Sequence, residues 1–90
     1  MTFTVYILRS SSNELYIGQT NNLPKRLKEH ITKSNRASKF TEDHNDFHLV
    51  YKEEYSILLE AMHREKQLKG WTRAKREALI SGDMLLLKQL

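Results

Sequence analysis

Residues 16–30 read Tyr-Ile-Gly-Gln-Thr-Asn-Asn-Leu-Pro-Lys-Arg-Leu-Lys-Glu-His, and this stretch decides the fold. We expect a strand to end at Gly18 and a helix to begin soon after it, because Asn21 or Asn22 can cap a helix that has Pro24 in its first turn. Gly18 lets the backbone approach a ligand closely, and the first turn of the helix offers unpaired N–H groups to an anion. The junction brings Arg26 and His30 near Tyr16, which indicates a site for a phosphodiester.

The helix that begins at this junction has one apolar stripe, formed by Leu23, Leu27 and Ile31 at four-residue spacing. Arg26 and His30, also four residues apart, share the flank beside that stripe. They could therefore point together at a site beside a sheet. The alternative is that both side chains are solvated, as charged residues on a helix flank usually are.

Two strands are expected before the junction. Phe3–Arg9 alternates and is rich in β-branched and aromatic residues, and Leu15–Gly18 resumes the pattern after the turn-forming residues Ser10–Asn13. If the turn closes over the three serines, Tyr6 falls opposite Tyr16 on one face of the hairpin. The alternative for both tyrosines is ordinary packing in the core.

The remaining elements follow from periodicity and caps. The polar stretch Thr32–Asp46 is expected to be a surface loop, and Phe47–Glu53 a third strand. We then expect a helix capped by Ser56 that runs to Lys69 and stops at Gly70, a helix over Arg73–Ile80 capped by Thr72, and a short helical segment over Asp83–Leu90 with Leu85–Leu87 packing back on the body.

Length and composition predict one domain over residues 1–90. The chain has no cysteine, which excludes disulfides, thiolate metal sites and a cysteine nucleophile, and is expected of a cytoplasmic protein. The apolar run near the N-terminus is too short for a signal peptide or a membrane span. Fifteen Lys and Arg against eleven Asp and Glu favour a polyanionic partner such as nucleic acid.

A carboxylate falls on the apolar stripe of the helix after Ser56. The apolar residues of that stripe are Leu58, Ala61, Met62 and Leu68. Glu65 shares their face, and a buried carboxylate is costly unless it is paired, hydrogen-bonded or bound to a cation. One interpretation is a ligand of Mg²⁺ or Mn²⁺, hard cations that prefer oxygen. The other is an ion pair with Arg26 or with a residue at the rim of the stripe.

Basic residues gather near the end of this helix, namely Lys66, Lys69, Arg73, Lys75 and Arg76 around Trp71. They could hold a phosphate backbone beside a stacking aromatic ring, or they could form a solvated helix face. Lys33 and Lys39 in the polar stretch could also contact nucleic acid.

The order of these candidate residues resembles the GIY-YIG nuclease family, in particular its small stand-alone single-domain members. The first family motif appears as Val5-Tyr6-Ile7 and the second as Tyr16-Ile17-Gly18. Asn22, Arg26, His30 and Glu65 follow in the family's order, and the similarity extends through residues 64–71 and nearly the whole chain.

The resemblance implies a small α/β (α+β) fold with a three-stranded antiparallel sheet flanked by helices. It also implies a DNA endonuclease that uses one divalent ion, Mg²⁺ or Mn²⁺, in repair or on particular DNA structures. Carried over by residue, Tyr6 and Tyr16 position and help deprotonate the attacking water, Arg26 stabilises the charged phosphorane, His30 assists proton transfer or contacts phosphate, Glu65 holds the metal, and Asn22 fixes the turn.

Two residues depart from the family pattern. Val5 replaces the glycine that opens the first motif, and Gln19 stands where the excision-repair enzymes of the family carry a lysine. The loss of that charge favours a second hypothesis, a non-catalytic nucleic-acid-binding module on the same scaffold. A third hypothesis is a protein-interaction role, in which Glu65 forms an ordinary ion pair.

Overall fold

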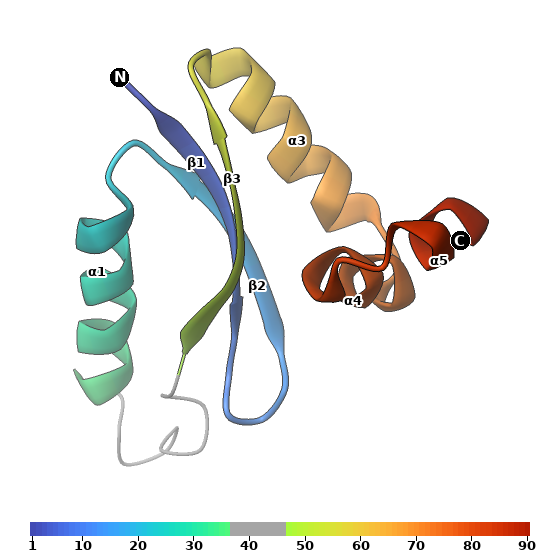
Figure 1. Cartoon of the computed structure of the whole chain (residues 1–90). Helices are drawn as coiled ribbons and strands as arrows, with labels where there is room; N and C mark the ends of the chain where they lie inside the picture. The colour runs from blue at the N-terminus through green and yellow to red at the C-terminus, as the bar shows by residue number, and fades with distance from the viewer. Residues whose placement is uncertain (37–46) are drawn as a thin grey trace.

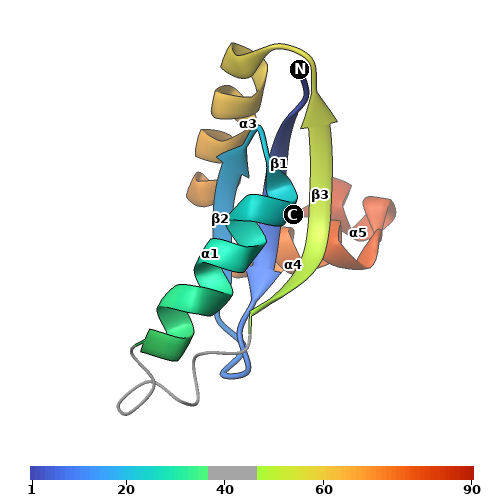
Figure 2. The same cartoon turned by 90° about the vertical axis from the view of Figure 1, so that its left-hand side faces the viewer.

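The computed structural model describes residues 1–36 and 47–90, with side chains described for 1–29 and 47–90. Strands β1 (Phe3–Arg9), β2 (Leu15–Thr20) and β3 (His48–Tyr55) form one sheet in the order β2-β1-β3, and β1 is antiparallel to both neighbours. Figure 1 shows helix α1 (Leu23–Arg36) on one side of this sheet. On the other side lie α3 (Leu58–Gly70), α4 (Arg73–Ser81) and α5 (Met84–Gln89), and Figure 2 shows the same layers with α1 in front. The three-stranded antiparallel sheet flanked by helices is confirmed.

The hairpin between β1 and β2 sets the strand register. The Ser10 N–H donates to the Glu14 carbonyl at 2.9 Å, and Asn13 takes a φ of 70°, a left-handed conformation that asparagine tolerates better than most residues. This turn is longer than predicted, so Tyr6 pairs with Gly18, and Tyr16 pairs with Leu8. The predicted direct pairing of Tyr6 with Tyr16 is therefore wrong. Because the register moves by two residues, both tyrosines still share one face of the sheet.

The junction after β2 also differs from the expectation. β2 continues through Gly18 to Thr20, and α1 begins behind Asn22, whose Oδ1 accepts a hydrogen bond from the Lys25 N–H at 3.2 Å. α1 runs to Arg36, so residues 32–36 are helical where a loop was predicted, since each residue added to a nucleated helix gains a backbone hydrogen bond. The rest of the predicted loop, residues 37–46, lies outside the described residues.

The helices α3 and α4 differ in whether the predicted capping residue marks the start of the helix. Thr72 caps α4 as predicted, with its side-chain oxygen accepting from the Lys75 N–H at 3.3 Å. Ser56 does not cap α3, because that helix begins at Leu58 behind Ile57 and has no side-chain cap hydrogen bond. Ser56 is therefore too early in the chain to reach the first free N–H groups.

The apolar core lies between the sheet and the helices α3 and α4. Its buried members are Val5, Ile7 and Ile17 from the sheet with Ala61, Leu68 and Leu79 from the helices. Leu58 and Met62, predicted for the buried stripe of α3, are 43% and 48% exposed, because a sheet of three strands covers only a narrow strip of the helix. At the C-terminus Leu87 packs against the core, whereas Leu85 and Leu86 stay exposed. Within the two described ranges, no helix is both long and apolar enough to cross a membrane.

Candidate active site

Tyr6 lies at the centre of the site, in the middle of the central strand. Its side chain is 1% exposed and its ring passes over Gly18 on the neighbouring strand. A Cβ atom at position 18 would lie 2.5 Å from Tyr6 Oη and 2.7 Å from Tyr6 Cζ. Gly18 is not one of the described residues with a positive φ. Its lack of a side chain therefore makes room for the Tyr6 ring and is not needed for a bend in the backbone.

Burial raises the pKa of Tyr6 to about 12. The positive charge of Arg26 opposes this shift, whereas Tyr16, Glu65 and Glu29 add to it. Two conclusions follow. The Tyr6 phenol is protonated at neutral pH, and it lies within electrostatic reach of side chains from β2, α1 and α3.

Arg26 reaches the site from the first turns of α1. Its Nε atom is buried and lacks a hydrogen-bond acceptor among the described residues, and Glu29 Oε1 lies 4.0 Å away as an ion-pair partner. A guanidinium with an unused buried donor is suited to an anion such as a phosphate oxygen. Tyr16 lies nearby on the sheet, 46% exposed, with its ring edge-on to Phe47 at 6.5 Å between centroids.

Glu65 lies on the sheet-facing side of α3, between the fully buried Ala61 and Leu68. Its side chain is 22% exposed and pairs with Lys69, one turn further along the helix, at 3.0 Å. The compensating charge expected for this carboxylate is therefore Lys69, a neighbour at i+4, rather than Arg26. Lys69 itself is 57% exposed, so the pair lies at the solvent edge.

The donor set of the site suits one kind of metal. No group of three or more His, Cys, Asp or Glu that could hold an ion occurs in the part of the chain that the structure describes. Structural and catalytic Zn²⁺ sites need three or four such ligands, whereas Mg²⁺ is usually held by one or two carboxylates with water and substrate phosphate. Glu65 fits the second pattern. Gln19 on β2 adds a buried side-chain oxygen, Oε1, for which the described residues supply no donor.

The other predicted contacts lie at different places. Lys66 is exposed on α3. His30 and Lys33 lie on α1, but their side chains, like the whole of Lys39, are outside the described residues. These roles stay predictions.

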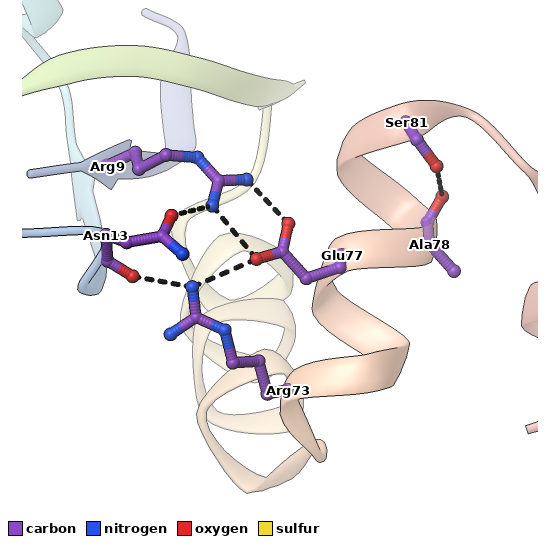
Figure 3. A network of polar contacts seen from close by, with 6 residues as sticks. All are labelled: Arg9, Asn13, Arg73, Glu77, Ala78 and Ser81. Atoms are coloured by element: carbon purple, nitrogen blue, oxygen red, sulfur yellow. Dashed lines mark hydrogen bonds and ion pairs between the residues drawn. The ribbon is translucent and has the colours of Figure 1, made fainter.

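Arg73 belongs to a polar network that joins the hairpin to α4 (Figure 3). Its Nη2 donates to Glu77 at 3.0 Å and to the Asn13 carbonyl at 2.5 Å. Arg9 holds the same carboxylate by two hydrogen bonds of 2.5 and 2.9 Å and also donates to Asn13 Oδ1. These bonds hold the pKa of Glu77 below its usual range. Arg73 therefore has a structural task beside its predicted contact with nucleic acid.

A second largely buried carboxylate was missed by the sequence reasoning. Glu53 on β3 is 17% exposed and accepts hydrogen bonds from Tyr51, Tyr55 and Arg64. Burial alone would raise the pKa of Glu53, but these hydrogen bonds together lower it. The signal was present in the sequence, because Tyr51, Glu53 and Tyr55 alternate and so share one face of a strand.

Comparison with known proteins shows to which family the chain belongs. A family model described as the GIY-YIG catalytic domain matches residues 2–78. A UPF0213 protein of Bacillus pumilus is 37% identical over 75 residues, which cover 83% of this chain and 74% of that protein. A UPF0213 protein of Natronomonas pharaonis is 33% identical over 79 residues, covering 88% and 91% of the two chains. The solution NMR structure of the UPF0213 protein of Bacillus halodurans superposes with a TM-score of 0.59 at 33% identity, covering 90% of this chain and 84% of that one.

Proposed function

Because the chain belongs to the GIY-YIG catalytic domain family, which implies nuclease-type function, we propose that it is an endonuclease that hydrolyses phosphodiester bonds in DNA with one divalent ion, Mg²⁺ or Mn²⁺. The observation that carries this proposal is the buried Tyr6 phenol of the central strand, packed over Gly18, together with the buried Arg26 Nε that lacks an acceptor among the described residues. The charges of Arg26 from α1 and Glu65 from α3 both influence the pKa of this phenol. In this proposal residues 1–90 form a single cytoplasmic domain that acts in DNA repair or cuts particular DNA structures.

Each side chain has a task in this proposal. Glu65 would hold the ion, which would supply positive charge to the phosphate and favour deprotonation of water. Arg26 binds a phosphate oxygen and stabilises the charge that develops on it. Tyr6, protonated at neutral pH, would donate a hydrogen bond that orients the attacking water, and the more exposed Tyr16 would help to position that water. His30 is assigned proton transfer or phosphate contact on the strength of the family resemblance.

The departures from the family pattern have different consequences. Val5 is fully buried in the apolar core, which supports a purely structural effect of the missing glycine. Gln19 brings an uncharged amide where a lysine would add a positive charge. We therefore expect slower chemistry than in a relative that carries the lysine.

A second candidate function is binding of nucleic acid without cleavage. The observation that favours it is the Lys69 ammonium at 3.0 Å from Glu65, which already neutralises the carboxylate assigned to the ion. A binding module of this kind would retard DNA in a salt-sensitive way without a divalent ion.

Cleavage of labelled DNA separates the two. Single-stranded, duplex and branched DNA and an RNA of the same sequence are incubated with Mg²⁺ or Mn²⁺, with a chelator as one control. Glu65→Gln should abolish cutting, whereas Glu60→Gln, an exposed carboxylate on the same helix, should not. Cuts that persist in Glu65→Gln would remove Glu65 from the site, and retardation without cuts in the wild type would establish the binding module.

A further inference from the structure

Glu53 is enclosed by hydrogen bonds at both carboxylate oxygens. Oε1 accepts from Tyr55 Oη at 2.6 Å and from Arg64 Nε at 2.9 Å. Oε2 accepts from Tyr51 Oη and from Arg64 Nη2, the latter at 3.0 Å. The arginine thus binds the carboxylate as a two-pronged fork, which fixes direction as well as distance.

Arg64 carries this constraint to α3 and to the residue next to it in the chain, Glu65. The Arg64 side chain is 21% exposed, and its guanidinium lies over the Trp71 ring at 5.1 Å from the ring centroid and donates to Gln67 Oε1 at 2.8 Å. Its orientation is therefore determined on several sides. A rotation or slide of α3 that moves Glu65 also moves the backbone of Arg64 and therefore strains the fork to Glu53.

The other contacts of α3 with the sheet are less directional. The helix buries only Ala61 and Leu68, and apolar contacts have little preference for direction. Its start has no side-chain cap hydrogen bond. Arg76 binds the carbonyls of Leu68 and Lys69, but this ties α3 to α4 rather than to the sheet. Within residues 1–36 and 47–90, the pair of Glu53 and Arg64 is the ion pair that joins α3 to a strand.

We propose that Glu53, acting through Arg64, is a positioning residue that fixes where α3 presents Glu65 to the candidate active site. The proposal rests on the proposed function for its chemical consequence. A misplacement of about 1 Å can cost roughly 100-fold in rate when reacting groups must be aligned. Glu53 itself binds neither the ion nor the substrate.

Binding of Mn²⁺ to the full chain without DNA, measured by electron paramagnetic resonance of the free ion, tests the consequence for the site. Glu53→Gln keeps the size of the side chain but replaces one acceptor with an N–H₂ group that faces the arginine. We expect about 10-fold weaker binding, the usual scale for groups that orient a metal ligand. Tyr55→Phe, which leaves the fork in place, should weaken binding in the same direction but less, and remains informative if Glu53→Gln does not fold.

Glu77→Gln is the matched control. Glu77 also accepts two bonds from one arginine and a third from another, but it anchors α4 to the hairpin. This variant should lower the melting temperature and leave the Mn²⁺ affinity within about twofold of the wild type. Loss of affinity in proportion to the loss of stability in both variants would reduce Glu53 to a stabilising role and overturn the proposal.

A second measurement does not depend on the ion. Because the chain has no cysteine, two can be introduced at exposed positions, Asn21 after β2 and Lys66 on α3, and spin-labelled. Glu53→Gln should broaden or shift the distance distribution between the labels, and Glu77→Gln should not. An unchanged distribution in Glu53→Gln overturns the proposal. If the wild type binds no Mn²⁺, the proposed cofactor fails, whereas these distances still decide whether Glu53 positions α3.

Discussion

Replacing Gly18 with alanine tests the packing on which the candidate site depends. The new Cβ would meet the Tyr6 hydroxyl at 2.5 Å and the ring carbon that carries it at 2.7 Å. Contacts below 3.0 Å are essentially never seen for real Cβ atoms. Only 1% of Tyr6 is exposed, so its ring cannot simply swing into solvent.

The magnitude follows from the displacement that is required. Moving the hydroxyl from 2.5 Å to an ordinary contact of 3.4 Å takes about 0.9 Å. Overpacking of this kind in a core typically costs about 1–3 kcal/mol of stability. Because a shift near 1 Å can lower a rate roughly 100-fold, we expect Gly18→Ala to lose most of its cleavage even where it stays folded.

The other two glycines are controls for the same substitution. Gly70 ends α3 with nothing within 4 Å of its Cβ position, so Gly70→Ala should be neutral or stabilise by about 0.5–1 kcal/mol. Gly82 caps α4 at a φ of 75° with open space around it, so Gly82→Ala should cost about 1–2 kcal/mol through backbone strain alone and leave cleavage intact.

Urea unfolding and DNA cleavage measured on the three variants give the answer. The decisive comparison is between Gly18→Ala and Gly82→Ala, which should lose similar stability but differ in activity. A Gly18→Ala protein as stable and as active as Gly70→Ala would refute the packing of Tyr6 over position 18. Equal activity of Gly18→Ala and Gly82→Ala would show that the tyrosine's place does not matter for cleavage.

Three further outcomes are expected. Thr72→Ala should destabilise the protein by about 1 kcal/mol in urea unfolding because it removes the cap bond from the Lys75 N–H, whereas Ser56→Ala, without such a bond, should not. The pKa of Glu53 is lowered in the folded state, so its stabilisation is present above the ordinary value of 4.5 and is lost as the pH falls through the lowered pKa. The stability difference between wild type and Glu53→Gln, measured across an acid titration, should therefore shrink below pH 4.5 and not change near pH 7. Lys66→Ala should weaken DNA retardation at low salt and reduce the salt slope by about one without changing the melting temperature.

Local patterns in the sequence predicted most of the elements. The alternation in Phe3–Arg9 gave β1 with its observed bounds, and Thr72 marked the start of α4. The register of the hairpin could not be obtained in this way, because it depends on how Asn13 closes the turn. A turn longer than expected moved the partner of Tyr6 from Tyr16 to Gly18, a change that no pattern of apolar residues records.

The position of a site residue could be predicted where it depends on one helix alone. It could not be predicted where it depends on contacts between two elements. The spacing of Ala61, Glu65 and Leu68 placed the carboxylate on the buried side of α3, and the structure agrees. The purpose of Gly18 was not visible, because it depends on a ring from another strand. The fork between Glu53 and Arg64 was missed because the two residues lie eleven positions apart, on different elements.

The two carboxylates of β3 and α3 show why burial alone does not identify a metal ligand. Glu53 has hydrogen bonds at both oxygens from three side chains, so an ion could bind there only by breaking several of them. Glu65 has an ion pair with the exposed Lys69, and helix pairs at i and i+4 contribute only about 0.3–0.5 kcal/mol. Breaking this pair therefore costs little, and a divalent ion brings twice the charge of the ammonium that it would replace. The partners of each carboxylate, rather than its exposed fraction, therefore separate the one that holds α3 in place from the one that is available to a cation.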